Sequence, residues 1–340
     1  MILIFSHNFI DEPTNRVIDW LLFFNADFKR INGDEFSPKN NFTLDLVDCC
    51  LKKDGQNFLN PNDVSVVWFR RWFNPRGKLI NYDGYKLKKY NSDEILLIEY
   101  YEIFLENELK AYSKGIFSLL NDKVWLPDER MTRGGLNKID VLVKAKKIGL
   151  LIPESIITSS KTEVVNFLKV NESLITKPIF EVVPIVHKND AISMLTKEVK
   201  MEDIEKFPDL FYPSLFQKKV EKEFELRVFI YKDKIYSIAM FTQNDEQTKV
   251  DFRNINVEKP NRYVPFLLPK SIENKLLILM NDVKLNTGTL DLMVNDKNEF
   301  IFLEINPIGQ FGMVSIGGNF HIEKMIAEDL IEYDENYDRI

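Results

Sequence analysis

The feature that most constrains the fold is a change in the spacing of apolar residues near residue 216. Beyond that point, apolar Val220, Phe224, Leu226 and Val228 alternate with charged residues over most of the stretch. A period of two is typical of a strand that has one face on the core and the other in solvent, as in many antiparallel sheets. We therefore predict a half-buried antiparallel strand here.

Before residue 216 the pattern is different, because helical spacing alternates with short strands. Met1–Phe5 and Val64–Phe69 are continuous apolar runs of strand length, and residues 95–109 carry apolar side chains at helical spacing. This mixture indicates an open α/β sheet in the first 125 residues. Residues 126–215 repeat the order helix, strand, helix, strand, with a predicted helical face from Leu136 to Lys146.

The last third adds a helix, a hairpin and a final helix. The expected elements are a helix at 271–283, strands at 289–294 and 300–306, a flexible glycine-rich loop at 309–318 and a helix at 320–331. The fold class is therefore α/β with an α+β part. We predict three domains: 1–125, 126–215 and 216–340.

Charge and cysteine content narrow the classes of partner and compartment. The chain has 45 basic and 52 acidic side chains and a net charge of -7, which disfavours general attraction to nucleic acid or anionic membranes. The apolar runs are too short to span a bilayer, and the amino terminus lacks the basic region of a secretory signal. Cys49 and Cys50 are adjacent and cannot form an ordinary disulfide, so we expect a cytoplasmic protein.

The predicted hairpin carries a possible metal site. If its turn centres on residues 297–298, Asp291 lies directly opposite Glu304, and strand alternation puts Asn306 on the same face. Facing carboxylates destabilise a sheet unless a cation lies between them, and oxygen ligands of this kind suit Mg²⁺. The alternative is a solvated hairpin whose acidic residues have no ligand.

Basic residues elsewhere could contact phosphate. Lys138 lies near the start of a predicted helix and Lys177 closes a predicted strand, and a lysine is a compact charge suited to phosphate oxygens. Arg227 shares a strand face with Glu225, and Arg253 lies in a polar segment between strands. Each has a structural alternative. Lys138 and Lys177 could be ordinary surface lysines, Arg227 could belong to a surface ion pair, and Arg253 could form a salt bridge within its loop.

Other common chemistries lack their local motifs. The sequence has no G-x-S-x-G, no Walker A motif and no G-x-G-x-x-G. Its three histidines are far apart in the chain, so neither a zinc site nor a serine triad is indicated.

Taken together, the motifs resemble those of ATP-grasp ligases. In chain order they are Lys138, Lys177, the hinge Gln217-Lys218-Lys219-Val220, Glu225-Leu226-Arg227, Asp291 and Glu304-x-Asn306-Pro307. Within that family, residues 216–228 look most like the microviridin-type peptide maturases, the graspetide ligases, and in particular the grasp-with-SPASM type. Trp68-Phe69-Arg70-Arg71-Trp72, Leu126-Pro127 and Asp251-Phe252-Arg253 are also similar to stretches of that subgroup.

The resemblance implies a fold and a set of residue roles. The fold would be an ATP-grasp fold with an amino-terminal α/β domain, a central α/β subdomain and a carboxyl-terminal antiparallel sheet, with ATP between the last two. The roles it implies concern ATP, Mg²⁺ and the reacting groups. Lys138 and Lys177 would hold phosphates, Gln217, Lys218 and Val220 would face adenine with Glu225 nearby, Asp291, Glu304 and Asn306 would ligate Mg²⁺, and Arg227 and Arg253 would act at the reacting phosphoryl and carboxylate groups.

The implied activity is peptide macrocyclisation. An Asp or Glu side chain of a ribosomally made precursor peptide would be phosphorylated by ATP, and a Ser or Thr hydroxyl or a Lys amine of the same peptide would then close an ester or amide ring. Relatives suggest a homodimer. Lys218 departs from the family, which commonly has an acidic residue at this hinge position.

Two alternatives to this activity stay open. A ligase of free amino acids or small peptides would keep every residue role described above. A non-catalytic nucleotide-binding regulatory protein would keep the fold without turnover.

Overall fold

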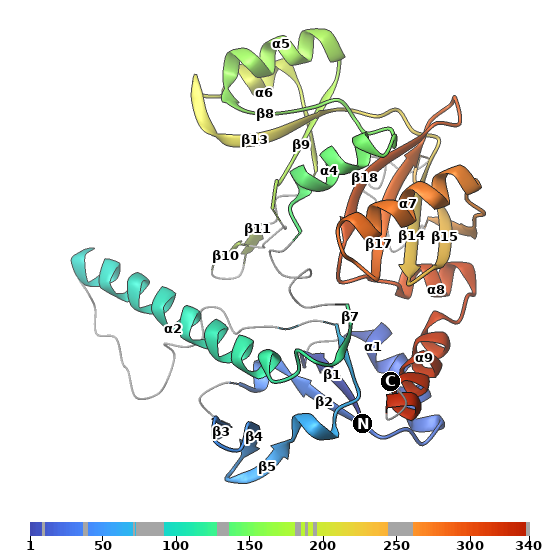
Figure 1. Cartoon of the computed structure of the whole chain (residues 1–340). Coiled ribbons are helices and arrows are strands. Elements are labelled where there is room, and N and C mark those ends of the chain that lie inside the picture. The colour runs from blue at the N-terminus through green and yellow to red at the C-terminus, as the bar shows by residue number, and fades with distance from the viewer. Residues whose placement is uncertain are drawn as a thin grey trace. The chain divides into compact units, whose positions relative to one another are not determined.

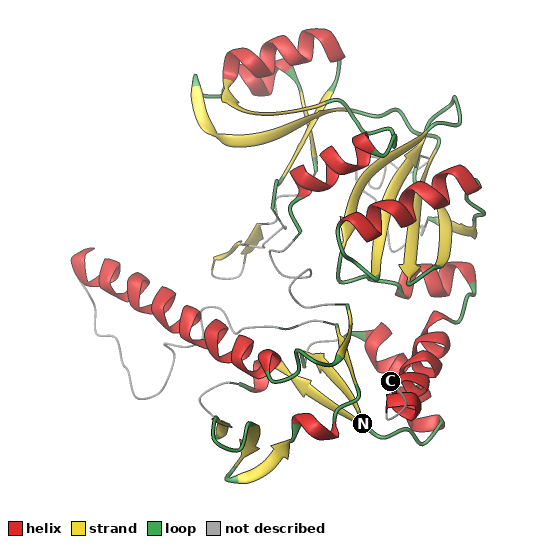
Figure 2. Cartoon of the chain, viewed as in Figure 1, coloured by secondary structure: helices red, strands yellow, loops and turns green. Residues whose placement is uncertain are grey.

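The computed structural model describes residues 1–8, 11–36, 40–70, 72, 92–127, 136–180, 185–187, 190–192, 196–243 and 261–337, without the side chains of 92–102, 185–187 and 190–192. The chain divides into two compact units. Unit 1 comprises residues 1–129 and 321–340, and unit 2 comprises residues 130–320. Each unit is built on sheets covered by helices (Figure 1; Figure 2).

Unit 1 is centred on a parallel sheet, which contains both apolar runs that were predicted as strands. Its strands in spatial order are β2 (Phe28–Asn32), β1 (Ile2–Ser6), β6 (Val66–Phe69) and β7 (Val124–Leu126). Strands buried on both faces read as continuous hydrophobic runs, and every residue of β1 and β6 is buried. The core of this unit is rich in aromatic rings, with Phe5 packed against Trp72 and Phe117.

Helices and a small second sheet complete unit 1. The helices are α1 (Glu12–Phe23), α2 (Ser92–Ser118) and α9 (Ile322–Asn336), and short 3₁₀ turns occur at Gly33–Glu35 and Pro61–Asp63. The second sheet is antiparallel and consists of β3 (Phe42–Asp45), β4 (Cys50–Lys53) and β5 (Gln56–Leu59). Of the two cysteines, Cys49 is exposed and Cys50 is buried, and both are free thiols.

Unit 2 begins with a helix and an antiparallel sheet. Helix α4 (Lys138–Lys147) precedes strands in the spatial order β12 (Lys197–Val199), β9 (Leu174–Lys177), β13 (Leu210–Lys218) and β8 (Ser155–Ser160). Helices α5 (Lys161–Asn171) and α6 (Met201–Glu205) lie on one face of this sheet (Figure 1). A separate two-stranded hairpin is formed by β10 (Ile185–His187) and β11 (Asp190–Ile192).

The second sheet of unit 2 is fully antiparallel. Its spatial order is β16 (Arg262–Pro265), β15 (Lys234–Phe241), β14 (Phe224–Tyr231), β17 (Thr287–Val294) and β18 (Phe300–Asn306). One face carries Leu226, Val228 and Leu290, which pack with apolar side chains of α4 and α7 (Lys270–Asp282). The opposite face carries Arg227 and Asp291, which lie in register across β14 and β17.

The prediction that β14 exposes one face to solvent is wrong. Glu225 is 3% exposed and Arg227 5%, although both lie on the polar face. Farther along the same face, Phe229 packs on Phe311. Charged side chains are almost never buried to this extent unless they are paired, so this face must hold compensating partners.

The predicted glycine-rich loop is also wrong over part of its length, because residues Gly312–Gly318 form helix α8. Glycine disfavours helices by itself, but Phe311 and Val314 are fully buried here. Gly317 lies close to Ile238 and Tyr263, so α8 packs on the Arg227 face of the sheet. Tertiary packing outweighs the weak local propensity.

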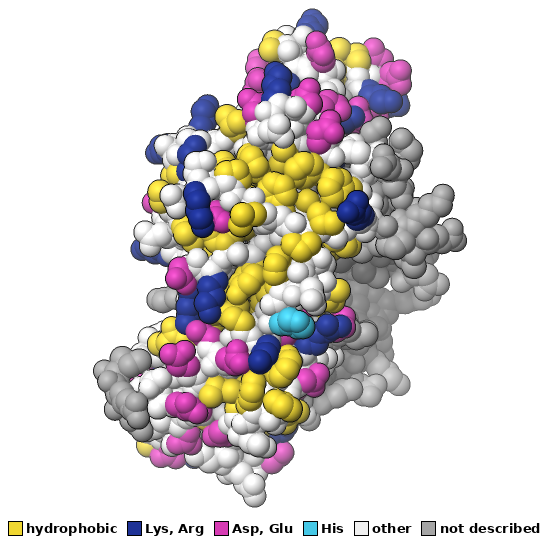
Figure 3. Space-filling model, turned by 90° about the vertical axis from the view of Figure 1, so that its right-hand side faces the viewer, with side chains coloured by type: hydrophobic (Ala, Val, Ile, Leu, Met, Phe, Trp, Pro, Cys, Tyr) yellow, Lys and Arg dark blue, Asp and Glu magenta, His cyan; other side chains and the backbone are white. Residues whose placement is uncertain are grey.

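The surface mixes charged and apolar side chains. In unit 2, Leu267 is 85% exposed and Ile316 is 60% exposed. Figure 3 shows hydrophobic side chains grouped on one face, with basic and acidic side chains interspersed around them. Among the described residues, no helix is both long enough and apolar enough to cross a membrane.

Candidate functional site

The two predicted acidic residues meet at the centre of the β17–β18 pair. Asp291 lies directly opposite Glu304, as predicted, and Asn306 lies opposite Thr289 on the same strand pair. The register changes between Asp291 and the turn, because Leu303 is an extra residue that forms a bulge. The predicted register is therefore correct at the site and shifted by one residue beside the turn.

Cationic side chains surround these carboxylates. The Nζ atoms of Lys138 and Lys177 lie 3.5 and 3.8 Å from Glu304 Oε2. Arg227, in register with Asp291, places Nη1 3.2 Å from Asp291 Oδ1. Because Lys177 is only 11% exposed, it is not an ordinary surface lysine. Five of the predicted site residues thus form one cluster.

Local structure positions Lys138. Lys138 is the first residue of α4, and the Asn137 side chain caps that helix by accepting hydrogen bonds from the N–H groups of Ile139 and Asp140. Lys138 Nζ also lies 3.5 and 3.4 Å from the carbonyl oxygens of Pro178 and Phe180, just beyond the end of β9.

A small cleft opens beside Lys138. Its volume is about 130 Å³. It is lined by Leu136, Asn137, Lys138, Val141, Ile179, Phe180, Leu303, Glu304, Ile305 and Pro307. Apolar walls with a few charged groups at one side are typical of small-molecule sites.

The predicted hinge connects β13 to β14. The Lys218 N–H donates to the Glu154 carbonyl at 2.8 Å, and the Lys219 N–H donates to the Ser173 carbonyl at 3.0 Å. The Val220 N–H has no acceptor in the described part of the chain. It is therefore a backbone donor that a ligand can use. Gln217 is 1% exposed and donates from Nε2 to Ser155 Oγ at 2.8 Å.

Glu225 lies at the base of the site in a nearly dry environment. Burial raises the pKa of its carboxyl, and nearby Asp291 raises it further, whereas the Lys222 ammonium opposes both effects. Lys222 Nζ lies 2.5 Å from Glu225 Oε1, and Thr242 Oγ1 donates to the same oxygen at 3.1 Å.

Sequence reasoning missed Lys222 and Thr242. A signal for Lys222 was present, because this lysine occupies a position where the two-residue alternation predicts an apolar side chain. A charge at a buried phase of a strand pattern indicates a buried partner.

The oxygen donors fit a magnesium ion. Among the described residues, no group of three or more His, Cys, Asp or Glu side chains forms a metal cluster. Mg²⁺ usually takes only one or two carboxylates and keeps several waters, so Asp291 and Glu304 suffice. Asn306 Oδ1 accepts the Ile308 N–H at 3.1 Å, and an amide oxygen has a second lone pair for a cation.

Two predicted features are not among the described residues of this cluster. Arg253, with the whole Asp251-Phe252-Arg253 stretch, falls outside the described residues. In the other stretch, Trp68 and Phe69 belong to β6 of unit 1 and Arg70 and Trp72 are buried there, whereas Arg71 is not described.

Comparison with solved structures gives matches over nearly the whole chain. The macrocyclase MdnC from Microcystis aeruginosa MRC, bound with precursor peptide MdnA, is 26% identical with a TM-score of 0.77, over 97% of this chain and 99% of that one. A Chryseobacterium gregarium RiPP-associated ATP-grasp ligase in complex with ADP and a leader and core peptide is 24% identical with a TM-score of 0.79, over 100% and 97%. The ATP-grasp ligase PsnB, complexed with a minimal precursor, Mg and ADP, is 14% identical with a TM-score of 0.72, over 98% and 97%.

Comparisons based on sequence add nothing to this result. No protein-family model matches the chain, and no curated protein matches it either. The structural similarity confirms the resemblance that the motifs indicate: this chain has the ATP-grasp fold and is similar throughout its length to ATP-grasp ligases that act on ribosomally made peptides.

Proposed function

We propose that the protein is an ATP-dependent macrocyclase of a ribosomally made precursor peptide. The observation that carries this proposal is the cluster in which Asp291 and Glu304 face each other among Lys138, Lys177 and Arg227. A peptide macrocyclase of 26% identity that matches 97% of the chain supports the choice of substrate. As further proposals, the enzyme works in the cytoplasm and forms a homodimer.

Each charged residue of the cluster has a role in this proposal. Lys138 and Lys177, which lie beside Glu304, bind ATP phosphate oxygens. Asp291, Glu304 and Asn306 hold Mg²⁺, which neutralises phosphate charge when bound. Arg227 stabilises charge on the phosphoryl group during transfer, and Arg253 contacts the substrate carboxylate.

The hinge residues bind the base. The Val220 N–H offers one hydrogen bond to the base. Gln217 and Lys218, the last two residues of β13, precede it in the chain and present their backbone to the base as well. Glu225, held by Lys222 and Thr242, supports the strand that carries Arg227.

The proposed chemistry proceeds in two steps. A carboxylate oxygen of a peptide Asp or Glu attacks the γ-phosphorus of ATP, giving an acyl phosphate and releasing ADP. A Ser or Thr hydroxyl or a Lys amine of the same peptide then attacks the carbonyl carbon and loses its proton as phosphate leaves with the C–O bonding electrons. Each ring costs the peptide one water, and binding both reacting groups in one site supplies the proximity that closure needs.

The test is intact mass spectrometry of a short Thr-, Ser-, Glu- and Asp-rich peptide encoded beside the gene, after incubation with the protein, ATP and Mg²⁺. We expect a loss of about 18 Da per ring that depends on ATP, since each closure removes one water. Asp291→Asn is the matched control and should abolish the loss, because it removes a carboxylate from the proposed metal set.

Other outcomes would contradict the proposal. An unchanged peptide mass, with ADP released only when free amino acids or small peptides are added, would identify a small-substrate ligase instead. Binding of ATP without turnover of either substrate would indicate a nucleotide-binding regulatory protein.

A further inference from the structure

Arg227 contacts two side chains of the neighbouring strand β17. Its Nη1 atom donates to both carboxylate oxygens of Asp291, at 3.2 and 3.4 Å, and its Nη2 atom donates to Thr289 Oγ1 at 3.4 Å. Thr289 lies opposite Phe229 in register, so it is a diagonal neighbour of Arg227 and within reach of a long side chain. The planar guanidinium is thus oriented by contacts on both of its terminal nitrogen atoms.

The hydroxyl of Thr289 is deeply buried. Thr289 is 1% exposed, and strand alternation puts it on the same face of β17 as Asp291. On its other side it lies opposite Asn306 of β18. A valine would fill the same space and suits a strand equally well, whereas a buried hydroxyl requires a polar partner. The guanidinium of Arg227 supplies such a partner.

A metal ion would affect the two contacts of Arg227 differently. In the proposed function Asp291 is a ligand of Mg²⁺, and a carboxylate that binds a dication attracts a guanidinium less strongly. Thr289 carries no charge and does not belong to the proposed metal ligands, so its contact with Nη2 does not compete with the metal. The orientation of Arg227 therefore depends more on Thr289 when the site is loaded than when it is empty.

We propose that Thr289 is a positioning residue that keeps the Arg227 guanidinium directed at the transferring phosphoryl group. This inference rests on the proposed function and adds to it a residue that acts through Arg227. The guanidinium stabilises developing charge only when its N–H groups are already aimed at the phosphoryl oxygens, because a preorganised donor needs no reorientation during the reaction. Loss of the hydroxyl would remove the acceptor of Nη2 and let the guanidinium turn.

The first experiment compares turnover and binding in full-length Thr289→Val, which keeps the shape of threonine without its hydroxyl. Turnover is the rate of mass loss from the short peptide encoded beside the gene, at saturating ATP and Mg²⁺, and binding is the Kd for ADP with Mg²⁺ by titration calorimetry. We expect kcat to fall roughly tenfold, as for the loss of a hydrogen bond to a charged group, and Kd to change by less than about twofold. Thr289→Ser keeps the hydroxyl and should restore most of kcat.

Two results of this experiment would overturn the inference. The first is a wild-type kcat in Thr289→Val. The second is a kcat in Thr289→Ser that is as low as in Thr289→Val, because the hydroxyl would then not be the group that matters.

The matched control is Thr287→Val. Thr287 is also buried on β17, with 4% exposure, but it lies opposite Tyr231, four residues farther along β14 than Arg227 and about 13 Å away from it. We expect this variant to keep the wild-type kcat, with any loss of stability confined to thermal unfolding. An equal fall of kcat in both valine variants would overturn the inference, because the loss would then come from the sheet and not from Arg227.

A second measurement follows the guanidinium itself and needs no peptide. In the presence of ADP and Mg²⁺, NMR of nitrogen-15-labelled arginine reports how fast the terminal nitrogen atoms of Arg227 rotate, and Arg227→Lys identifies its signal. We expect slow rotation in the wild type and in Thr289→Ser, and averaged signals in Thr289→Val. Averaged signals in the wild type would overturn the inference.

The two measurements separate this inference from the proposed function. If the wild type closes no ring but holds the Arg227 guanidinium in slow rotation, the proposed function fails and the contact with Thr289 is retained. If the wild type closes rings and Thr289→Val closes them equally fast, only the positioning role fails.

Discussion

Lys222 and Glu225 form a deeply buried ion pair beside the site, with side chains that are 3% and 4% exposed. Lys222→Met would leave the carboxylate buried without its cation. We expect the free energy of unfolding to fall by about 3–5 kcal/mol, as when one partner of a buried pair is removed. Urea denaturation followed by circular dichroism measures this change.

The control replaces both partners. Lys222→Met combined with Glu225→Leu removes the uncompensated charge and should recover most of the lost stability. If the double variant is no more stable than the single variant, the pair does not act through burial of charge.

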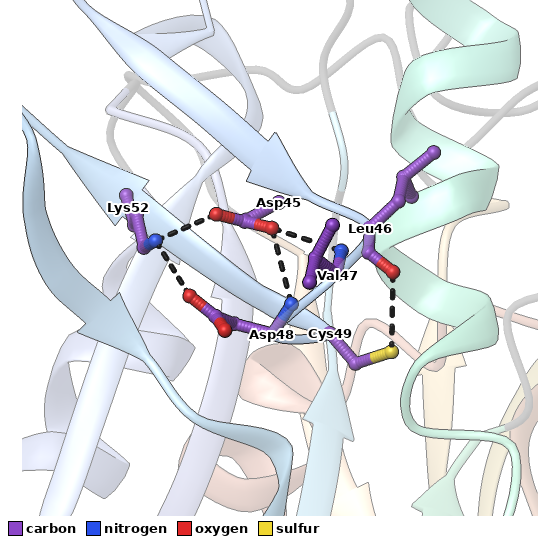
Figure 4. A network of polar contacts seen from close by, with 6 residues as sticks. All are labelled: Asp45, Leu46, Val47, Asp48, Cys49 and Lys52. Atoms are coloured by element: carbon purple, nitrogen blue, oxygen red, sulfur yellow. Dashed lines mark hydrogen bonds and ion pairs between the residues drawn. The ribbon is translucent and has the colours of Figure 1, made fainter.

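Asp45 illustrates how a surface turn sets a pKa. The Lys52 ammonium and the N–H groups of Asp48 and Val47 contact its carboxylate and lower its pKa from 3.8 to about 2 (Figure 4). Since the folded-state pKa is lowered, the stabilisation is complete above pH 3.8 and is lost as the pH falls through about 2. NMR titration of carbon-13-labelled aspartate measures this pKa directly.

The control for this prediction is Lys52→Met, which removes the first cause of the shift. The pKa of Asp45 should then rise toward 3.8. A pKa that does not change in the variant would mean that the ion pair does not form in solution.

At the scale of elements, α8 shows how close packing permits a helix made of poor helix formers. A Cβ added to Gly318 would overlap the ring of Phe320, and that ring packs on Tyr236 of β15. Gly318→Ala should therefore lower the stability of unit 2 by about 1–3 kcal/mol, the usual cost of overpacking. Thermal unfolding measures the effect.

A second substitution separates the clash from helix propensity. In the Gly318→Ala and Phe320→Ala double variant, the added methyl group meets no ring, so the two losses should not add. If the losses of stability in the two single variants add in the double variant, the Phe320 ring is not the reason that position 318 needs glycine.

At the scale of the whole molecule, α9 belongs to unit 1, although all the other helices and strands of that unit precede unit 2 in the sequence. Its Ile326 and Leu330 are buried, and it packs against α1. The α-amino group of Met1 lies 2.5 Å from Asp334 Oδ1. Removal of residues 321–340 should destabilise unit 1, so hydrogen exchange should accelerate in β1 and β6 while β14 and β17 keep their protection.

The milder variant Asp334→Asn removes only the ion pair with the amino terminus. Because this pair is partly exposed, we expect a loss of about 1 kcal/mol or less. For the truncated chain without residues 321–340, hydrogen exchange that accelerates equally in both units would contradict the prediction, because α9 would then stabilise the whole chain rather than unit 1 alone.

The sequence by itself determined several of the strands and the facing of the acidic pair. Period-two alternation and a short turn fix which residues of a hairpin oppose each other, so Asp291 and Glu304 could be paired without a structure. The helix at α4 and the strand at β9 were predicted for the same reason, since periodicity and end signals are local.

Tertiary structure alone decided the rest. The bulge at Leu303, the burial of Glu225 with Lys222 and the helix at Gly312–Gly318 depend on contacts between residues distant in sequence. The approach of Lys138 and Lys177 to Glu304 also depends on contacts between residues distant in sequence. A local pattern shows which face of an element a side chain occupies, but it does not show what packs against that face. Packing across the core supplies that information.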